Sequence, residues 1–255
     1  MRFSPAPLRE LPPVTRALAA LIFTGWLAEL AFGRGLNLCF GLVPSDFTGR
    51  LRLWQAVTYI FIHADFWHFL FNAFMLWMLG RMIEPVMGSR KFLAYFLACG
   101  AAAALITVAI DPGSFRPVIG ASGAIYGLLG AFAFLYPDAT VYFYFLFPMS
   151  ARSMAFLLGA VEFVMTISRP GSGISSVTHL GGLAAGLLWL WAERRWRGRL
   201  LERERSAATG PDPAATEKAE VDRLLEKISG KGQASLSRSE VSRLDEYARK
   251  KGGRA

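Results

Sequence analysis

Ser122 is the residue of this 255-residue chain whose surroundings most invite a chemical explanation. It lies between small residues in the stretch GASGAIYG (120–127), at the head of an apolar run that continues to Leu135. A serine hydroxyl becomes a nucleophile when a neutral imidazole accepts its proton during attack on a carbonyl. A serine between glycines is also a common packing residue, so the other polar residues must decide between the two interpretations.

The three histidines of the chain are the candidate bases, and each falls in or against an apolar segment. Ionisable groups at membrane depth are costly and commonly mark a water-filled site. His68 and Asn72 are four residues apart, so they share one face of a helix. His63 comes just before the same segment, and His179 lies in a later one. We therefore expect a polar site where these segments meet.

Two G-x-x-x-G patterns, at 123–127 and 182–186, follow Ser122 and His179 within one helical turn. Such patterns let two helix backbones approach closely in lipid. If the two glycine faces meet, the Ser122 hydroxyl and the His179 imidazole come within hydrogen-bonding reach. A serine nucleophile and its general base require that arrangement.

Other polar groups nearby suit stabilisation of the oxyanion that forms on such an attack. His68 and Asn72 supply N–H donors without a carboxylate's negative charge. The first-turn backbone amides of the helix that begins near Ser122 have no intrahelical partner. Tyr126, one turn after Ser122, can pack against the imidazole and orient it, a task that an aspartate performs in soluble triads.

Two other chemistries fit these residues poorly. GASGA is not the nucleophile elbow G-x-S-x-G, because position 124 is alanine and no strand precedes it. A zinc helix of the H-E-x-x-H type does not match, because His63 and His68 are five residues apart with no glutamate between them. We expect no metal and no cofactor. Glu29 and Glu162 also lie in apolar segments, and we interpret both as structural or interior-facing acids outside the catalytic set.

The composition is that of a membrane protein. Hydrophobic residues make up 53% of the chain and charged residues 18%, and the mean hydropathy is +0.35. The isoelectric point near 9.9 is typical of basic cytoplasmic loops, so we do not expect nucleic-acid binding. Two cysteines, Cys39 and Cys99, do not make a disulfide framework, and no signal peptide stands out.

Six apolar segments are long enough to cross a bilayer, or nearly so. They cover about 14–33, 66–83, 91–110, 120–136, 151–168 and 176–193. With a cytoplasmic N-terminus, eleven Lys and Arg residues fall in the inside segments and five in the outside ones, which favours cytoplasmic termini. The connection 34–65 is then outside, and the aromatic stretch VYFYFLF (141–147) is expected in the interface.

These patterns predict an all-α membrane protein with three parts. Residues 1–199 form a six-span membrane domain, 200–215 a linker and 216–255 a soluble cytoplasmic helical hairpin. The linker is predicted from SAATGPDPAAT (206–216), which is rich in small and turn-forming residues. In the tail, SRSE (237–240) predicts a capping box at a helix start.

Three motifs together resemble the rhomboid intramembrane serine proteases over roughly residues 50–195: HADFWHFLFN (63–72), GASGAIY (120–126) and HLGGLAAG (179–186). The resemblance implies a six-helix core and a Ser122–His179 dyad. It implies oxyanion stabilisation by His68, Asn72 and the Ser122 backbone amide, and stacking of Tyr126 on the imidazole. Gly120 matches the family's glycine two residues before the serine, and His63 matches a supporting histidine.

The resemblance also implies the partners and the setting. Substrates would be single-span membrane proteins within the lipid bilayer, whose spans unwind easily near the outer surface. The stretch RPGSGISS (169–176) is a plausible mobile cap over the site. Short basic loops and the lack of a transit peptide favour a bacterial plasma membrane. Two departures stand out: Gln55 follows Trp54 where many members carry arginine, and Thr178 stands where alanine is frequent.

Two alternative functions remain open at this point. An inactive relative would bind transmembrane helices without cutting them, but such relatives typically lose the serine or the histidine, and this chain keeps both. A small transporter or proton channel would use His68 and His179 as a relay. That reading predicts inverted repeats or an acidic partner near the histidines, and the sequence contains no evident repeat.

Overall fold

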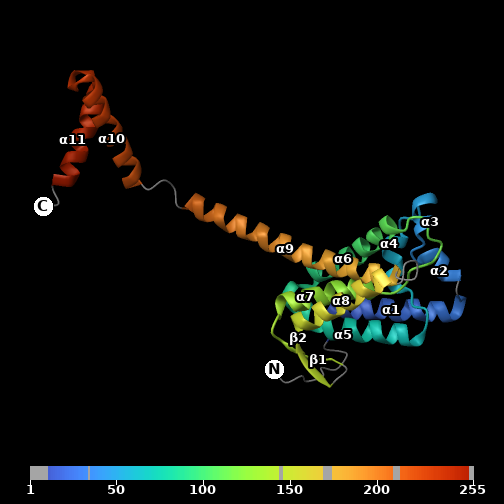
Figure 1. Ribbon diagram of the computed structural model, residues 1–255. Coiled ribbons are helices and arrows are strands. Elements are labelled where there is room, and N and C mark those ends of the chain that lie inside the picture. The colour runs from blue at the N-terminus through green and yellow to red at the C-terminus, as the bar shows by residue number, and fades with distance from the viewer. Residues whose placement is uncertain (1–10, 34, 144–145, 169–173, 209–212, 253–255) are drawn as a thin grey trace. The chain divides into compact units, whose positions relative to one another are not determined.

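Helices occupy all six of the apolar segments expected to cross a membrane, and much of the remaining chain is helical too. The structure is a computed structural model and describes residues 11–33, 35–143, 146–168, 174–208 and 213–252 (Figure 1). Within these residues the helices are α1 (Pro13–Phe32), α2 (Gly35–Phe40), α3 (Pro44–Gly49), α4 (Gln55–Thr58), η2 (Tyr59–Phe61), α5 (Phe66–Met87), α6 (Ser89–Ile110), α7 (Ser122–Leu135), α8 (Ala151–Ser168), α9 (Ile174–Ala208), α10 (Pro213–Lys231), η3 (Gln233–Ser235) and α11 (Arg238–Gly252).

Four helices of the described chain, α1, α5, α6 and α8, are long and apolar enough to cross a membrane. Helix α7 is apolar but shorter, with 14 residues. The sixth apolar segment begins helix α9, which continues well beyond it for a total of 35 residues. Because helices of this length and composition satisfy their backbone groups internally, the chain is a multi-pass integral membrane protein.

Helix α7 lies inside the bundle, where it contacts α5, α6 and α8. Nine of its 14 residues are buried, and small residues bring neighbouring helices close to it. A Cβ atom on Gly182 of α9 would collide with the backbone carbonyl of Gly123, and one on Gly186 would lie 2.9 Å from the carbonyl oxygen of Gly127. The two G-x-x-x-G faces therefore meet, which is the condition under which the sequence placed Ser122 within reach of His179.

Glu84, near the end of α5, holds the start of α1. Helix α1 begins after Pro12 with no side-chain cap of its own, so its first N–H groups need an acceptor from elsewhere. The Glu84 carboxylate accepts the Val14 N–H at 3.0 Å and the Thr15 N–H at 2.7 Å. It also accepts the hydroxyls of Thr15 at 2.7 Å and of Ser89 at 2.6 Å. A buried acid thereby ties α1 to α5 and to the start of α6.

Gln55, one of the two departures from the resembled family, holds together the connection between α1 and α5 through hydrogen bonds to its backbone. Its side chain is fully buried, and it accepts the Val43 N–H at 3.1 Å and donates to the Leu38 carbonyl at 3.2 Å. The neighbouring Trp54 donates its indole N–H to the Cys39 carbonyl at 2.9 Å. The amide of Gln55 thus both donates and accepts within this loop, whereas an arginine can only donate.

A two-stranded hairpin lies between α7 and α8. The chain is therefore mostly helical, and the predicted all-α class missed these two strands. Strand β1 (Thr140–Phe143) pairs antiparallel with β2 (Phe147–Ser150), with Val141 opposite Met149. These strands include part of the aromatic stretch that we expected only to lie in the interface. Val141 and Met149 pack against the core, whereas Tyr142 is exposed. In β1, exposed and partly buried residues alternate, as expected for a strand, and its β-branched and aromatic residues favour that conformation.

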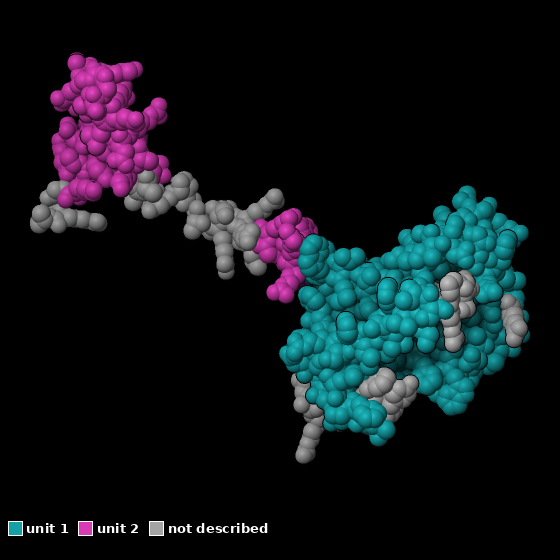
Figure 2. All heavy atoms as spheres, viewed as in Figure 1, with its two compact units in different colours: residues 1–193 teal, residues 194–255 magenta. Residues whose placement is uncertain are grey.

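The chain divides into two compact units, residues 1–193 and 194–255 (Figure 2). Helix α9 runs to Ala208 and α10 begins at Pro213, so helix extends into both ends of the stretch 200–215 that we expected as a linker. The sequence RRWRGRLLERE (194–204) is rich in arginine, leucine and glutamate, which favour helix. Residues 209–212 lie outside the described part of the chain.

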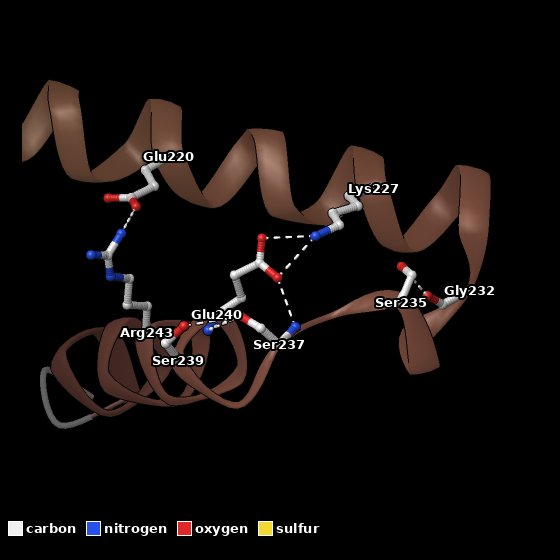
Figure 3. A network of polar contacts seen from close by, with 8 residues as sticks. All are labelled: Glu220, Lys227, Gly232, Ser235, Ser237, Ser239, Glu240 and Arg243. Carbon is white, nitrogen blue, oxygen red and sulfur yellow. Dashed lines mark hydrogen bonds and ion pairs between the residues drawn. The ribbon is translucent and has the colours of Figure 1, made fainter.

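Helices α10 and α11 contact each other as a hairpin. Figure 3 shows the polar contacts that join them. Glu240 accepts two hydrogen bonds from Lys227, at 2.8 and 2.9 Å. It also accepts the Ser237 N–H at 2.7 Å, and the Ser237 hydroxyl accepts the Glu240 N–H at 3.3 Å. This reciprocal pair confirms the predicted capping box. Val221 and Leu224 of α10 are buried.

Candidate active site

Helix α7 begins at Ser122, and a sharp turn at Gly120 directs the chain into it. Gly120 has a φ of +111°, a region that side-chain-bearing residues rarely adopt. Its N–H donates to the Tyr59 carbonyl at 2.9 Å. A Cβ atom at this position would lie 2.5 Å from Nε2 of His68. Two independent reasons therefore require glycine at position 120: the positive φ of the turn and the close approach of the His68 ring.

Ser122 and His179 form the centre of the site. The Nε2 atom of His179, on α9, lies 2.7 Å from the Ser122 hydroxyl oxygen. The Tyr126 ring stacks on the imidazole with centroids 4.5 Å apart and planes 7° apart. All three side chains are partly buried. The structure thus brings together the three residues that the sequence placed on two separate helices.

Glu162 of α8 also points into the site, although we expected it only to be a structural or interior-facing acid. Its Oε1 atom lies 2.7 Å from Nδ1 of His179 and accepts the Tyr126 hydroxyl at 2.7 Å. A carboxylate in an apolar span needs a polar partner, and this was the available signal for a functional contact. The identity of that partner depends on how α8 packs against α7 and α9.

The Glu162 carboxylate determines which ring nitrogen of His179 carries the proton. An ionised carboxylate can only accept hydrogen bonds, so its partner Nδ1 must donate. In a neutral imidazole the other nitrogen, Nε2, is then an acceptor. Nε2 faces the Ser122 hydroxyl, so the hydroxyl donates to it. This is the tautomer that a general base for serine requires.

His68 and Asn72 each line a cavity that Ser122 also borders. Asp65 caps the start of α5 by accepting the His68 N–H at 2.9 Å, which places His68 in the first turn. His68 lines a cavity of about 190 Å³ together with Gly120, Ser122 and His179. Asn72 lines a second cavity, of about 220 Å³, that Ser122 also borders. Its amide donates to the His68 carbonyl at 2.7 Å.

His63 contacts the backbone of the turn that precedes Ser122. It is fully buried, and its Nε2 atom accepts the Ala121 N–H at 3.4 Å. Its ring lies 5.0 Å from that of His68, with the two planes 63° apart. His63 therefore contacts the backbone next to Ser122 and not the serine itself.

Thr178, the second departure from the resembled family, lies just before His179 and is buried. Its hydroxyl oxygen is 2.8 Å from that of Thr107 on α6. This contact ties the histidine-bearing turn of α9 to α6. Of the stretch 169–176 that we expected as a cap, residues 169–173 lie outside the described part of the chain, and Ser175 lines the smaller cavity.

No metal-binding cluster of three or more His, Cys, Asp or Glu side chains occurs in the part of the chain that the structure describes. The polar groups near Ser122 include the imidazoles of His179 and His68, the amide of Asn72, the phenol of Tyr126 and, beyond His179, the carboxylate of Glu162. Such a set can move a proton between Ser122 and His179 and can donate hydrogen bonds to a developing oxyanion.

The fold and this site define a multi-pass helical membrane protein with a serine–histidine pair inside its helix bundle. Residues 50–196 match the family of the Rhomboid domain. Because this match covers more than half of the sequence, the chain belongs to the rhomboid family. Residues 214–250, which contain most of α10 and α11, match a second family, described as a family of unknown function, DUF6576.

Curated relatives of this chain include rhomboid proteins of bacteria and of mitochondria. The chain is 30% identical over 136 residues to Rhomboid protein 1, mitochondrial, of Saccharomyces cerevisiae, covering 51% of this chain and 39% of the relative. It is 30% identical over 149 residues to Rhomboid protease GluP of Bacillus subtilis, covering 58% and 28%. It is 26% identical over 151 residues to Rhomboid protease GlpG of Haemophilus influenzae, covering 59% and 75%. The chain thus spans less than half the length of the first two.

Proposed function

We propose that this chain is an intramembrane serine endopeptidase that cleaves the membrane-spanning segments of single-span proteins near the outer membrane face. Ser122 is the nucleophile, His179 is the general base, and no metal or cofactor takes part. The distance of 2.7 Å between His179 Nε2 and the Ser122 hydroxyl, inside a bundle of apolar helices, carries this proposal. The names of the relatives, two of which are rhomboid proteases, support it.

The reaction follows from the atoms around Ser122. As the hydroxyl oxygen attacks the scissile carbonyl, its proton passes to His179 Nε2, and the imidazolium then protonates the leaving amine. The oxyanion accepts hydrogen bonds from His68, Asn72 and the first-turn backbone amide of Ser122. Water, activated by His179, hydrolyses the acyl-enzyme. Gly120 and His63 hold the turn that places the serine.

An apolar groove next to the cavity that contains Ser122 supports a transmembrane substrate. An apolar groove of about 580 Å³ is bounded by α5, α7, α8 and β1. Four of its lining residues also line the cavity that contains Ser122 and Asn72; these are Phe71, Met75, Leu129 and Leu158. An apolar segment lying in the groove would therefore reach the nucleophile without crossing a polar surface.

The membrane topology is part of the proposal. Six helices, α1, α5, α6, α7, α8 and the first part of α9, cross the membrane, and the tail from residue 216 is cytoplasmic. The positions of these helices and the excess of basic residues in the loops on one side support this arrangement. The short basic loops favour a bacterial plasma membrane.

Cleavage by purified protein in liposomes tests the function. We expect wild type to cut members of a panel of labelled single-span proteins and to react with a fluorophosphonate probe. Ser122→Ala should abolish both, and His179→Ala should reduce both to background, because each residue is needed to form the nucleophile. A folded wild type that neither cuts nor reacts would overturn the proposal and favour the alternative, a rhomboid-like protein that binds transmembrane helices without cutting them.

A further inference from the structure

We propose that Glu162 completes a Ser122–His179–Glu162 relay and acts as the positioning residue for His179. This inference rests on the proposed protease function and assigns a role that a serine–histidine dyad does not contain. The carboxylate sits on α8, the nucleophile on α7 and the base on α9, so three helices build the relay.

The geometry restrains the imidazole of His179 in three directions. Nε2 faces Ser122 at 2.7 Å, and Nδ1 faces Glu162 Oε1 at 2.7 Å. The ring face lies against Tyr126, nearly parallel to it. The Tyr126 hydroxyl donates to the same Glu162 oxygen at 2.7 Å, so the carboxylate itself is held. A ring restrained at both nitrogens and on one face cannot swing away from the serine without breaking one of these contacts.

The surroundings strengthen the effect of the carboxylate. The side chains of His179 and Glu162 are 19% and 15% exposed, so both lie largely out of water. When Nε2 takes the serine proton, the imidazole becomes a cation opposite the Glu162 anion. A charge-assisted hydrogen bond in a partly desolvated site is stronger than one in water. Glu162 thus stabilises the charge that appears on His179 during the reaction, as well as the tautomer that precedes it.

The pattern of burial along α8 indicates that Glu162 is present for its polar contacts in the site and not to pack α8 against its neighbours. The buried residues of α8 are Ala151, Met154 and Ala155, all in its first two turns. Around Glu162 the helix exposes large apolar side chains, including Val161 and Phe163. A carboxylate is an expensive choice for helix packing at such a place, because an apolar residue would avoid its desolvation. Its contacts with His179 and Tyr126 offset that cost.

The decisive comparison uses Glu162→Gln, Glu162→Asp and a matched control, Glu29→Gln. The glutamine is isosteric, but its amide can donate as well as accept, so it no longer selects the Nδ1–H tautomer or carries a charge. The aspartate keeps the charge on a side chain one methylene shorter. Glu29 is a buried acid in α1, outside the site, so its substitution controls for the removal of any intramembrane carboxylate.

We expect Glu162→Gln to lower kcat for cleavage in liposomes by about 10- to 100-fold, with KM changed far less. Fluorophosphonate labelling should slow in parallel, because it reports activation of Ser122. Glu162→Asp should recover part of the loss, and Glu29→Gln should match wild type. Nitrogen NMR of protein labelled at its histidines should show the Nδ1–H tautomer of His179 in Ser122→Ala, and loss of that preference when Glu162→Gln is added.

Two results would overturn the inference while the protease function stands. One is a Glu162→Gln protein that cuts and labels at wild-type rates. The other is an unchanged His179 tautomer in the NMR experiment, which reads the contact directly even where a variant is less stable. A wild type that neither cuts nor labels overturns the protease function instead, and the inference with it.

Discussion

The phenol ring of Tyr126 and the imidazole of His179 lie face to face, 4.5 Å apart and 7° from parallel. Tyr126 is one helical turn after Ser122, so α7 supplies both the candidate nucleophile and the surface against which its base rests. The same tyrosine donates its hydroxyl to Glu162. Stacking and hydrogen bonding therefore come from different atoms of one side chain and can be separated by substitution.

Tyr126→Phe should lower the rate of cleavage by about tenfold or less, because it removes one hydrogen bond to a carboxylate and keeps the stacked ring. Tyr126→Ala should cost about 10²-fold, because the imidazole also loses the surface that orients it. Steady-state cleavage in liposomes measures both. Tyr136→Phe, at the end of α7 and outside the site, is the control. Equal rates for Tyr126→Phe and Tyr126→Ala would contradict a role for the stack.

Gly120→Ala should reduce cleavage by about 10²-fold, because a misplacement of the serine by about 1 Å has an effect of that order. The alanine would also meet a backbone conformation that costs about 1–2 kcal/mol and would push against His68. Cleavage and probe labelling report the loss. Gly113→Ala is the matched control, since it lies before α7 with open space around its Cβ position. Comparable activity of the two variants would argue against the tight turn.

Gly182→Ala should destabilise the bundle by about 1–3 kcal/mol, because its methyl group would force α9 away from the Gly123 carbonyl. The same movement would lengthen the contact between Ser122 and His179 and lower activity. Thermal unfolding in detergent and probe labelling measure the two effects. Gly198→Ala, on the same helix with open space at its Cβ position, should leave labelling unchanged and should not lower stability, because alanine favours helix over glycine. Retained labelling by Gly182→Ala would show that α9 adjusts without moving His179.

The tail hairpin should loosen in acid through Glu240. Hydrogen bonds from Lys227, and then from the Ser237 backbone, lower the pKa of this carboxyl from about 4.5 to about 2. Because the folded pKa lies below the unfolded value, its contribution to stability is complete above about pH 4.5 and is lost as pH falls towards 2. Hydrogen exchange of residues 213–252 in the whole protein should rise across that window. In Glu240→Gln the rise should be smaller, whereas Glu226→Gln, at an exposed site of α10, should behave as wild type.

Periodicity along single helices accounts for what sequence reasoning predicted correctly. The six apolar segments are helical, because runs of apolar residues this long have few other solutions in lipid. Sequence reasoning recognised two glycine faces that could meet, and they do meet, because glycines four residues apart let the two helix backbones approach closely. The capping box at 237–240 is local chemistry within four residues and needs no tertiary information.

The prediction was incomplete where two local structures suit the same residues. The hairpin of β1 and β2 was missed because its aromatic and β-branched residues suit an interfacial segment as well as a strand. The predicted linker 200–215 stays a prediction: α9 continues to Ala208 through a run of good helix formers beyond its apolar part, and residues 209–212 lie outside the described chain. For the hairpin, an interfacial segment and a strand suit the residue types about equally well, so local sequence does not decide between them.

The sequence by itself determined which residues share a helical face: His68 with Asn72, and Ser122 with Tyr126. Those relationships depend only on the 3.6-residue period, which the covalent chain imposes wherever a helix forms. Only the tertiary structure decided that Glu162 meets His179. The two side chains lie on different helices, and the faces that α8 and α9 turn towards each other depend on packing across the whole bundle. Spacing along the chain carries no information about that contact.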